Sequence, residues 1–332
     1  MNLYFPPFIY SFFLFSGTII SISSTSLFGI WIGLEINLIS FIPIIINLEN
    51  NKKSREAAIK YFLIQAIASA IVIFRSLYYY LIRGYSFSFT PNAIITLALA
   101  IKVGMAPFHF WFPEVLEGLN WINALLLLTW QKISPLLILS LFFHSNILLP
   151  LALTSAILGA ISGINQTSIR KILAFSSISH LGWIGRIIYL NSSLWIDYFF
   201  IYIFTRLILC LSFWILNLNY FSQLTLVKNL NEKFIIFINL LSLGGLPPLL
   251  GFFPKWIAII TIRNNFPILI ILISSSLITL YFYTRLCFST FTLYIQRIVW
   301  SQKDTSKKNF YFLRIITFLT IFGILPISLI NF

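Results

Sequence analysis

The chain has 332 residues, of which 59% are hydrophobic and only 9% are charged, and its mean hydropathy is +0.94. This composition excludes a soluble globular domain, because the chain cannot supply the polar surface that such a domain needs. Long apolar runs instead predict an all-α, polytopic membrane protein. The formal net charge of +14 indicates basic loops and contact with anionic lipid. Binding to nucleic acid is not expected, because the sequence has no dense basic face.

Metal, nucleotide and flavin sites have no support in the sequence. The two cysteines, Cys210 and Cys287, lie in separate apolar segments, and there is no CxxC or Cys/His cluster of the kind that holds zinc or an iron–sulfur cluster. Neither a dinucleotide fingerprint nor a phosphate-binding loop motif is present. The N-terminus has no basic leader, so we expect no cleaved targeting segment.

Eleven apolar segments follow one another along the chain, each about 20 residues or longer, which is enough to cross about 30 Å of hydrocarbon. They are 5–26, 29–48, 57–82, 92–113, 121–143, 147–165, 170–190, 195–218, 234–261, 267–296 and 311–331. Lysine and arginine concentrate in loops on the N-terminal side of the membrane, which the positive-inside rule places in the matrix of a mitochondrion. Aromatic residues at segment ends, such as Trp121, Trp195 and Tyr198, are expected to be interface anchors.

Two segments contain sequences that interrupt an α-helix. Residues 102–111 read KVGMAPFHFW, and residues 244–256 read GGLPPLLGFFPKW. Proline removes a backbone donor and clashes with the preceding turn, so both helices are predicted to break where protein or a wet cavity covers them. The breaks lie five segments apart, which predicts two inverted five-helix repeats, 1–145 and 146–300, followed by a loop and C-terminal helix, 301–332.

Four charged residues lie within apolar segments: Glu35, Lys102, Lys132 and Lys255. A charge at the bilayer centre costs about 3 kcal/mol on insertion scales, so residues that carry one are expected to move ions or protons. Lys102 lies too deep to reach bulk water. Burial disfavours its charged form and a nearby carboxylate favours it, so Glu35 is expected to control its protonation. The alternative is a static ion pair that fixes helix packing.

The two other lysines of this set and His180 extend the Glu35–Lys102 pair into a predicted relay. Lys132 is expected to exchange a proton with Lys102 through water, or else to bond carbonyl groups freed by Pro135. His180 lies in a serine-rich patch and titrates in the range that a relay needs, although a hydrogen-bonded packing role is equally open. Lys255 is expected on the exit side, unless its side chain snorkels to the interface.

Two carboxylates follow the first break on the basic side of the membrane, Glu114 and Glu117. They can gather protons, bind a partner subunit or lie in a solvated loop, and the loop is the expected case. His109, beside the same break, is expected to be structural rather than functional.

At these residues the chain resembles the antiporter-like membrane subunits of mitochondrial respiratory complex I, and among them the NADH dehydrogenase subunit 2 group. The matching strings are GLEIN at 33–37, KVGMAPFHFW at 102–111, WQK at 130–132, GINQT at 163–167 with RK at 170–171, SSISHLGW at 176–183 and LGGLPPLLGFFPKW at 243–256. The resemblance implies an antiporter-like fold, and its glutamate–lysine–lysine–lysine proton relay falls on the four intramembrane charges named above.

The resemblance also implies where the protein acts and with what. It places the chain in the mitochondrial inner membrane, among other membrane-arm subunits of complex I and in contact with anionic phospholipid such as cardiolipin. NADH, FMN, iron–sulfur clusters and ubiquinone are expected in those partner subunits, so no cofactor is expected in this chain. The alternatives are a stand-alone cation/proton antiporter subunit, and a scaffold whose charges serve assembly alone.

Methionine and arginine are distributed unusually. Two methionines are few for a chain so rich in isoleucine, and Arg75, Arg186 and Arg206 lie in apolar segments. Invertebrate mitochondria read ATA as methionine and AGA as serine. We hypothesise that these codons were read as isoleucine and arginine, so that the three arginines are serines in the cell and +14 overstates the charge.

Overall fold

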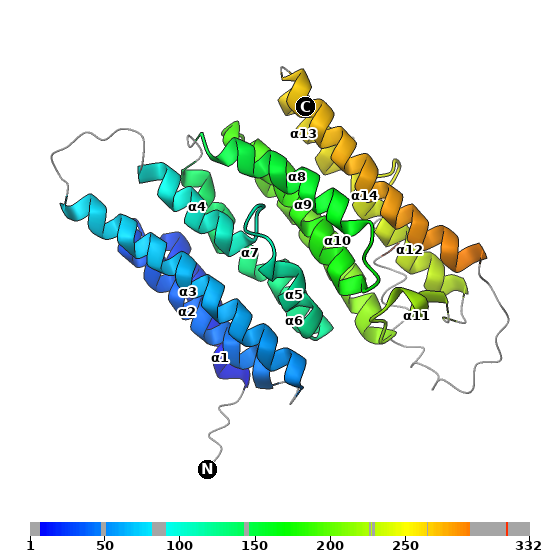
Figure 1. Ribbon diagram of the computed structural model, residues 1–332, viewed down its shortest axis with the longest axis horizontal. Helices are drawn as coiled ribbons and strands as arrows, with labels where there is room; N and C mark the ends of the chain where they lie inside the picture. Colours follow the sequence, from blue (N-terminus) through cyan, green and yellow to red (C-terminus); the bar gives the residue numbers. More distant parts are fainter. Residues whose placement is uncertain are drawn as a thin grey trace, which may run out of the picture. The chain divides into compact units, whose positions relative to one another are not determined.

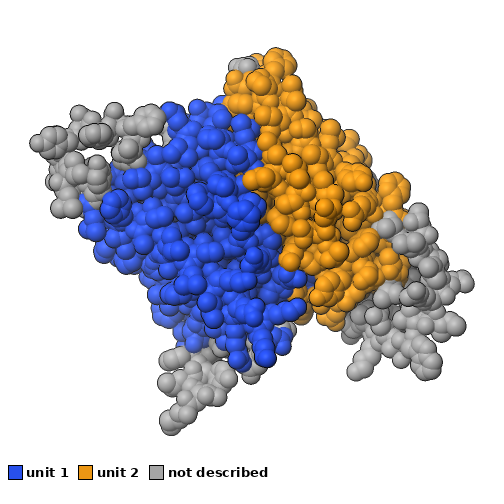
Figure 2. Space-filling view, viewed as in Figure 1, with its two compact units in different colours: residues 1–154, 188–191 blue, residues 155–187, 192–332 orange. Residues whose placement is uncertain are grey.

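The computed structural model describes residues 7–47, 51–81, 91–142, 146–225, 227, 230–263, 265–292 and 317. Within these residues the regular structure is α-helical, apart from one isolated β-bridge between Ser168 and Tyr220. The expectation of an all-α protein is confirmed. Two compact units are formed, residues 1–154 with 188–191 and residues 155–187 with 192–332, and Figure 2 colours them separately. We call them unit 1 and unit 2.

In the described residues, seven helices precede the passage from unit 1 to unit 2, which occurs within α8 (Figure 1). They are α1 (Pro7–Ser23), α2 (Leu27–Asn47), α3 (Lys52–Leu81), α4 (Pro91–Val103), α5 (Trp111–Gly118), α6 (Trp121–Leu128) and α7 (Trp130–Leu141). The rest of the described chain forms α8 (Leu148–Gly163), α9 (Ile169–Tyr189), α10 (Leu194–Ile215), α11 (Phe221–Thr225), α12 (Leu230–Gly244), α13 (Phe252–Ile262) and α14 (Phe266–Thr292).

The helices have the length and surface of membrane spans. Six are long and apolar enough to cross a bilayer, and four shorter apolar helices accompany them in the described part of the chain. Large apolar side chains such as Phe8, Phe200 and Phe266 are more than 70% exposed, as expected of a surface that faces lipid rather than water. The predicted segment 311–331 lies outside the described residues, apart from Thr317.

Both predicted helix breaks are confirmed. The first separates α4 from α5 and the second separates α12 from α13. Each begins at a glycine with φ +82°, Gly104 or Gly245, a conformation that L side chains rarely adopt. In the first, the amides of Gly104 and Met105 both donate to the carbonyl of Ala100. In the second, the equivalent amides donate to the carbonyl of Leu241.

The two breaks also match in sequence without a gap when residue 104 is placed on residue 245. The strings are then GMAPFHFWFPEV at 104–115 and GLPPLLGFFPKW at 245–256, with identical residues at four positions. A cis X-Pro bond occupies the same place in both, Ala106–Pro107 and Pro247–Pro248. In this register Lys255 corresponds to Glu114. The two segments are therefore two versions of one local structure.

A third interruption, between α6 and α7, is not predicted by the sequence. It falls at Thr129, whose φ of −117° and ψ of −71° differ from those of a regular α-helix, and whose hydroxyl donates to the carbonyl of Leu125 at 2.7 Å. Pro135 lies inside α7, where it cannot donate to the carbonyl of Gln131. The proline is therefore not itself the point at which this span is divided.

In unit 2, α9 is the most enclosed of the candidate spans, with 89% of its apolar window buried. Its N-terminal end is held by the segment before α11. Ile169 donates from its amide to the carbonyl of Asn219, and the Arg170 guanidinium donates to the side-chain oxygen of Asn219 at 2.7 Å. Arg170, the first residue of the RK string, thus helps to fix the helix that carries His180.

Candidate functional site

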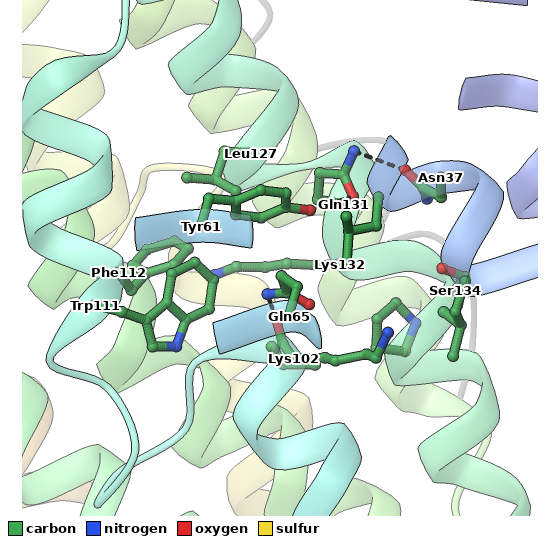
Figure 3. A pocket seen from close by; sticks show the side chains of 14 residues that line it. Asn37, Tyr61, Gln65, Lys102, Trp111, Phe112, Leu127, Gln131, Lys132 and Ser134 are labelled. Carbon is green, nitrogen blue, oxygen red and sulfur yellow. Dashed lines mark hydrogen bonds between the residues drawn. The ribbon is translucent and has the colours of Figure 1, made fainter. Parts of the chain in front are cut away.

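Unit 1 encloses a small cavity that brings together two of the predicted relay residues, Lys102 and Lys132 (Figure 3). Its volume of about 20 Å³ accommodates roughly one water molecule. Its walls come from α2 to α7, and they combine aromatic rings with amide, hydroxyl and ammonium groups. A buried space of this composition can hold a water between two amines, as proton exchange between them requires.

Lys102 lies in the last turn of α4, directly before the first break, and its side chain is 6% exposed. The break leaves carbonyl groups without helical partners, and neighbouring side chains satisfy them. Gln65 donates from Nε2 to the carbonyl oxygen of Lys102 at 3.2 Å, and the Thr154 hydroxyl donates to the carbonyl of Ala106 at 3.1 Å. The Lys102 backbone is thus fixed by α3, while its side chain extends toward the part of α7 that carries Ser134 (Figure 3).

Lys132 lies in the first turn of α7 and is 2% exposed. Its ammonium nitrogen is 4.7 Å from the ring centroid of Phe112, which is 1% exposed. A cation over an aromatic face is stabilised by the ring quadrupole, and more so in a desolvated site. Figure 3 shows the two lysine side chains lying along the same cavity, with Lys132 directed toward Phe112 rather than toward Lys102.

Glu35 lies on α2 and is partly buried. Its carboxylate interacts electrostatically with Lys102, as the sequence predicts. The two side chains do not form a salt bridge, and Glu35 does not line the cavity. The arrangement is therefore not the static ion pair that was the alternative to a modulating role.

A string of hydrogen bonds beside the lysines was missed by the sequence analysis. The Tyr61 hydroxyl donates to Gln131 Oε1 at 3.2 Å, and Gln131 Nε2 donates to Asn37 Oδ1 at 2.8 Å. Asn37 follows Glu35 by two positions on α2, and Gln131 precedes Lys132 on α7. One signal was available: Tyr61 and Gln65 are polar, four residues apart in an apolar helix, and therefore share a face.

In unit 2, Lys255 lies in the first turn of α13, after the second break, and is 6% exposed. Its Nζ donates to the carbonyl oxygen of Gly244, the last residue of α12, at 2.7 Å. The ammonium group is therefore directed into the protein, and the alternative that Lys255 snorkels to the interface is wrong.

His180 lies on α9 and is 7% exposed. Its Nδ1 is 2.8 Å from the hydroxyl oxygen of Tyr198 on α10, and its ring contacts Tyr202. Tyr198 is 2% exposed, and Trp121 and Trp195 are also buried, so the prediction that these three residues are interface anchors is wrong. Aromatic residues near span ends can face the protein interior equally well, and here Tyr198 positions the histidine.

The chain matches over residues 24–280 the family described as NADH:quinone oxidoreductase/Mrp antiporter, transmembrane. The chain belongs to this family. It is 44% identical to NADH-ubiquinone oxidoreductase chain 2 of Anopheles gambiae, over 95% of this chain and 94% of that relative. It is 43% identical to the Mus musculus protein of the same name, over 84% of each chain. The resemblance expected from the sequence is confirmed.

Chains of two solved structures share the fold. A chain of respiratory complex I from Thermus thermophilus superposes with a TM-score of 0.83 and 21% identity, over 96% of this chain and 78% of that one. A chain of the Mrp complex from Dietzia sp. gives a TM-score of 0.76 and 18% identity, over 83% and 59%. The antiporter-like membrane fold that the sequence predicts is thus the fold of this chain.

The described residues include no group of three or more His, Cys, Asp or Glu side chains that could hold a metal ion. Both cysteines are buried free thiols. Among the described residues, unit 1 brings together Lys102 and Lys132, and unit 2 brings together His180 and Tyr198.

Proposed function

We propose that this chain is a proton-translocating subunit in the membrane arm of NADH:ubiquinone oxidoreductase, respiratory complex I. Curated relatives of that name cover almost the whole chain. The observation that carries the mechanism is the joint burial of Lys102 and Lys132 on one water-sized cavity, directly beside a broken helix. The chain takes part in the enzyme as a subunit and holds no redox centre of its own.

The proposed relay begins with Glu35. Its carboxylate acts on Lys102 without a direct ion pair, so a movement or protonation of Glu35 alters how firmly Lys102 holds its proton. Lys102 then passes the proton through the cavity water to the neutral amine of Lys132, whose charged form is stabilised by the Phe112 ring. His180 and Lys255 of unit 2 continue the relay toward the exit side.

The proposed architecture comprises about eleven transmembrane helices and two inverted five-helix repeats, with boundaries near residues 145 and 300. The matched geometry and sequence of the two breaks support the repeat. The basic loops support an N-terminus in the matrix, and the mitochondrial relatives support an inner-membrane location.

The proposed partners are the other membrane-arm subunits of complex I and anionic phospholipid such as cardiolipin. The excess of basic over acidic residues, 22 to 8, favours the lipid contact. NADH, FMN, iron–sulfur clusters and ubiquinone would be bound by partner subunits, which deliver the energy that drives the relay.

A stand-alone cation/proton antiporter subunit is the second candidate. It is favoured by the family description, which joins quinone oxidoreductases with Mrp antiporters, and by the fold shared with the Dietzia Mrp complex. Its proton flux would depend on sodium and would be independent of NADH.

A native gel of mitochondria solubilised in mild detergent separates the two candidates. The gel is stained for NADH oxidation and probed with an antibody against this chain. Migration with a very large NADH-oxidising band is the expected result. A small species without NADH oxidation would contradict the complex I assignment and favour the antiporter.

A further inference from the structure

A second polar cavity lies between α3 and α5 of unit 1, about 170 Å³ in volume and therefore large enough for several water molecules. We call it the α3–α5 vestibule. It is lined by Lys53, Glu56, Ala57 and Lys60 of α3 and by Glu114, Glu117 and Gly118 of α5. Gly118 permits the two helices to meet at one end of it, since a Cβ there would lie 2.6 Å from the carbonyl oxygen of Lys53.

An ion pair spans the vestibule. Lys60 Nζ lies 2.7 Å from Glu114 Oε2, and the two side chains are 47% and 54% exposed. Solvent-exposed ion pairs contribute little to stability, because water screens the charges and both long side chains lose freedom. The pair is therefore poorly explained as a device that holds α3 and α5 together.

The vestibule and the lysine cavity are lined by adjacent residues of the same two helices. Tyr61 follows Lys60 on α3, Trp111 precedes Glu114 by one helical turn on α5, and both aromatic residues line the lysine cavity. Their ring centroids are 6.0 Å apart. Tyr61 and Trp111 thus lie close in sequence to vestibule residues on α3 and α5, and both line the cavity that holds Lys102 and Lys132 (Figure 3).

When the two breaks are aligned, Glu114 occupies the position of another ionisable residue. Its counterpart after the second break is Lys255, a buried residue that bonds the backbone of its own break. The same position thus holds an ionisable group in both halves. In the second half the group is directed inward, and in the first half it is directed to Lys60 in the vestibule.

We propose that Glu114, paired with Lys60, is the proton-loading group of this chain, and this inference rests on the proposed function. The Glu114 carboxylate accepts a proton from a hydronium ion in the vestibule, which becomes water as the new O–H bond forms. The neutral acid then separates from Lys60, which keeps its charge. The acid then gives its proton, through water between Tyr61 and Trp111, to the neutral amine of Lys132. Glu114 is again a carboxylate and pairs with Lys60 once more.

The test compares Glu114→Gln with Glu114→Asp in the assembled complex, reconstituted into vesicles, and measures protons translocated per NADH oxidised. Glu114→Gln is expected to lower this ratio, because an amide cannot carry the proton, and Glu114→Asp is expected to retain most of it. Asp197→Asn, at an exposed carboxylate in the first turn of α10 and outside the vestibule, is the control and is expected to leave the ratio unchanged.

A merely structural pair would behave differently. Glu114→Gln would then reduce the amount of assembled complex while the complex that does assemble keeps its normal ratio, and this result would overturn the proposal. Lys102→Met, measured in the same series, separates the two levels of inference. If it lowers the ratio and Glu114→Gln does not, only the loading role fails, whereas if neither variant lowers it, the proposed function fails as well.

Discussion

Lys255, in the first turn of α13, caps the C-terminal end of α12, because its Nζ donates a 2.7 Å hydrogen bond to the carbonyl oxygen of Gly244. The same side chain is thus both a proposed proton carrier and the partner of a backbone group left over by the helix break. A neutral amine still has N–H groups to donate, so the bond can persist when the proton leaves. Structural and proton-carrying roles can then be separated by substitution.

Lys255→Arg is expected to keep the helix end intact and to abolish proton transfer at this position, because arginine donates hydrogen bonds but does not release its proton in proteins. Lys255→Met is expected to lose both, and an unsatisfied buried carbonyl costs about 1–3 kcal/mol. Thermal denaturation of the purified complex measures the stability of the helix end, and the number of protons translocated per NADH oxidised measures proton transfer. An arginine variant with normal translocation would exclude Lys255 as a proton carrier.

Gln65→Leu is expected to destabilise the first break by about 1–3 kcal/mol, because the carbonyl of Lys102 would lose its side-chain partner in a buried site. The decrease in thermal stability of the complex is the measurement. Ser69→Ala is the control on the same helix, since its hydroxyl bonds only to the carbonyl of Ala66 within α3. Equal stability of the two variants would show that the carbonyl of Lys102 finds another hydrogen-bond donor when Gln65 is replaced.

Tyr61→Phe and Gln131→Leu are each expected to slow proton translocation, because the Tyr61–Gln131–Asn37 string orients side chains on the lysine cavity. Each lost hydrogen bond costs about 1 kcal/mol. The residues belong to one string, so the double variant should be less affected than the sum of the two single variants. A double-mutant cycle on thermal stability checks this, and strict additivity would mean that the string does not act as a unit.

Peptide mass spectrometry of the native protein is expected to find serine at positions 186 and 206. Arg206 is fully buried, and its contacts include the carbonyl of Leu173, the hydroxyl of Ser176 and the ring of Tyr202, none of which neutralises its charge. A buried guanidinium without a carboxylate partner is unfavourable. Spectra that show arginine at both positions would refute the codon hypothesis.

The sequence predicted the features that depend on local chemistry. Glycine and proline act over a few residues, so the breaks after Lys102 and before Lys255 could be placed from the sequence alone. The interruption at Thr129 carries no such signal, because the residue is neither glycine nor proline. The all-helical membrane fold follows from composition, whereas the count of eleven spans and the inverted repeat remain predictions.

The candidate site was predicted where a charge lies in an apolar helix, as at Lys102 and Lys132, because such a charge is rare and informative. Neutral polar residues such as Gln131 occur widely in membrane helices, so the hydrogen-bonded string could not be singled out. Tyr198 was wrongly placed at the interface because the direction of a side chain depends on which helix lies beside it. Glu114 was expected in a solvated loop, and this was wrong, because the residue lies on α5 and pairs with Lys60.

The most direct test of the central claim is the number of protons translocated per NADH oxidised by a Lys102→Met complex in sealed vesicles. The variant should assemble, because the bond from Gln65 is made to the Lys102 backbone and not to its side chain. We predict that it oxidises NADH but moves fewer protons for each one oxidised. An assembled Lys102→Met complex with an unaltered ratio would contradict the account.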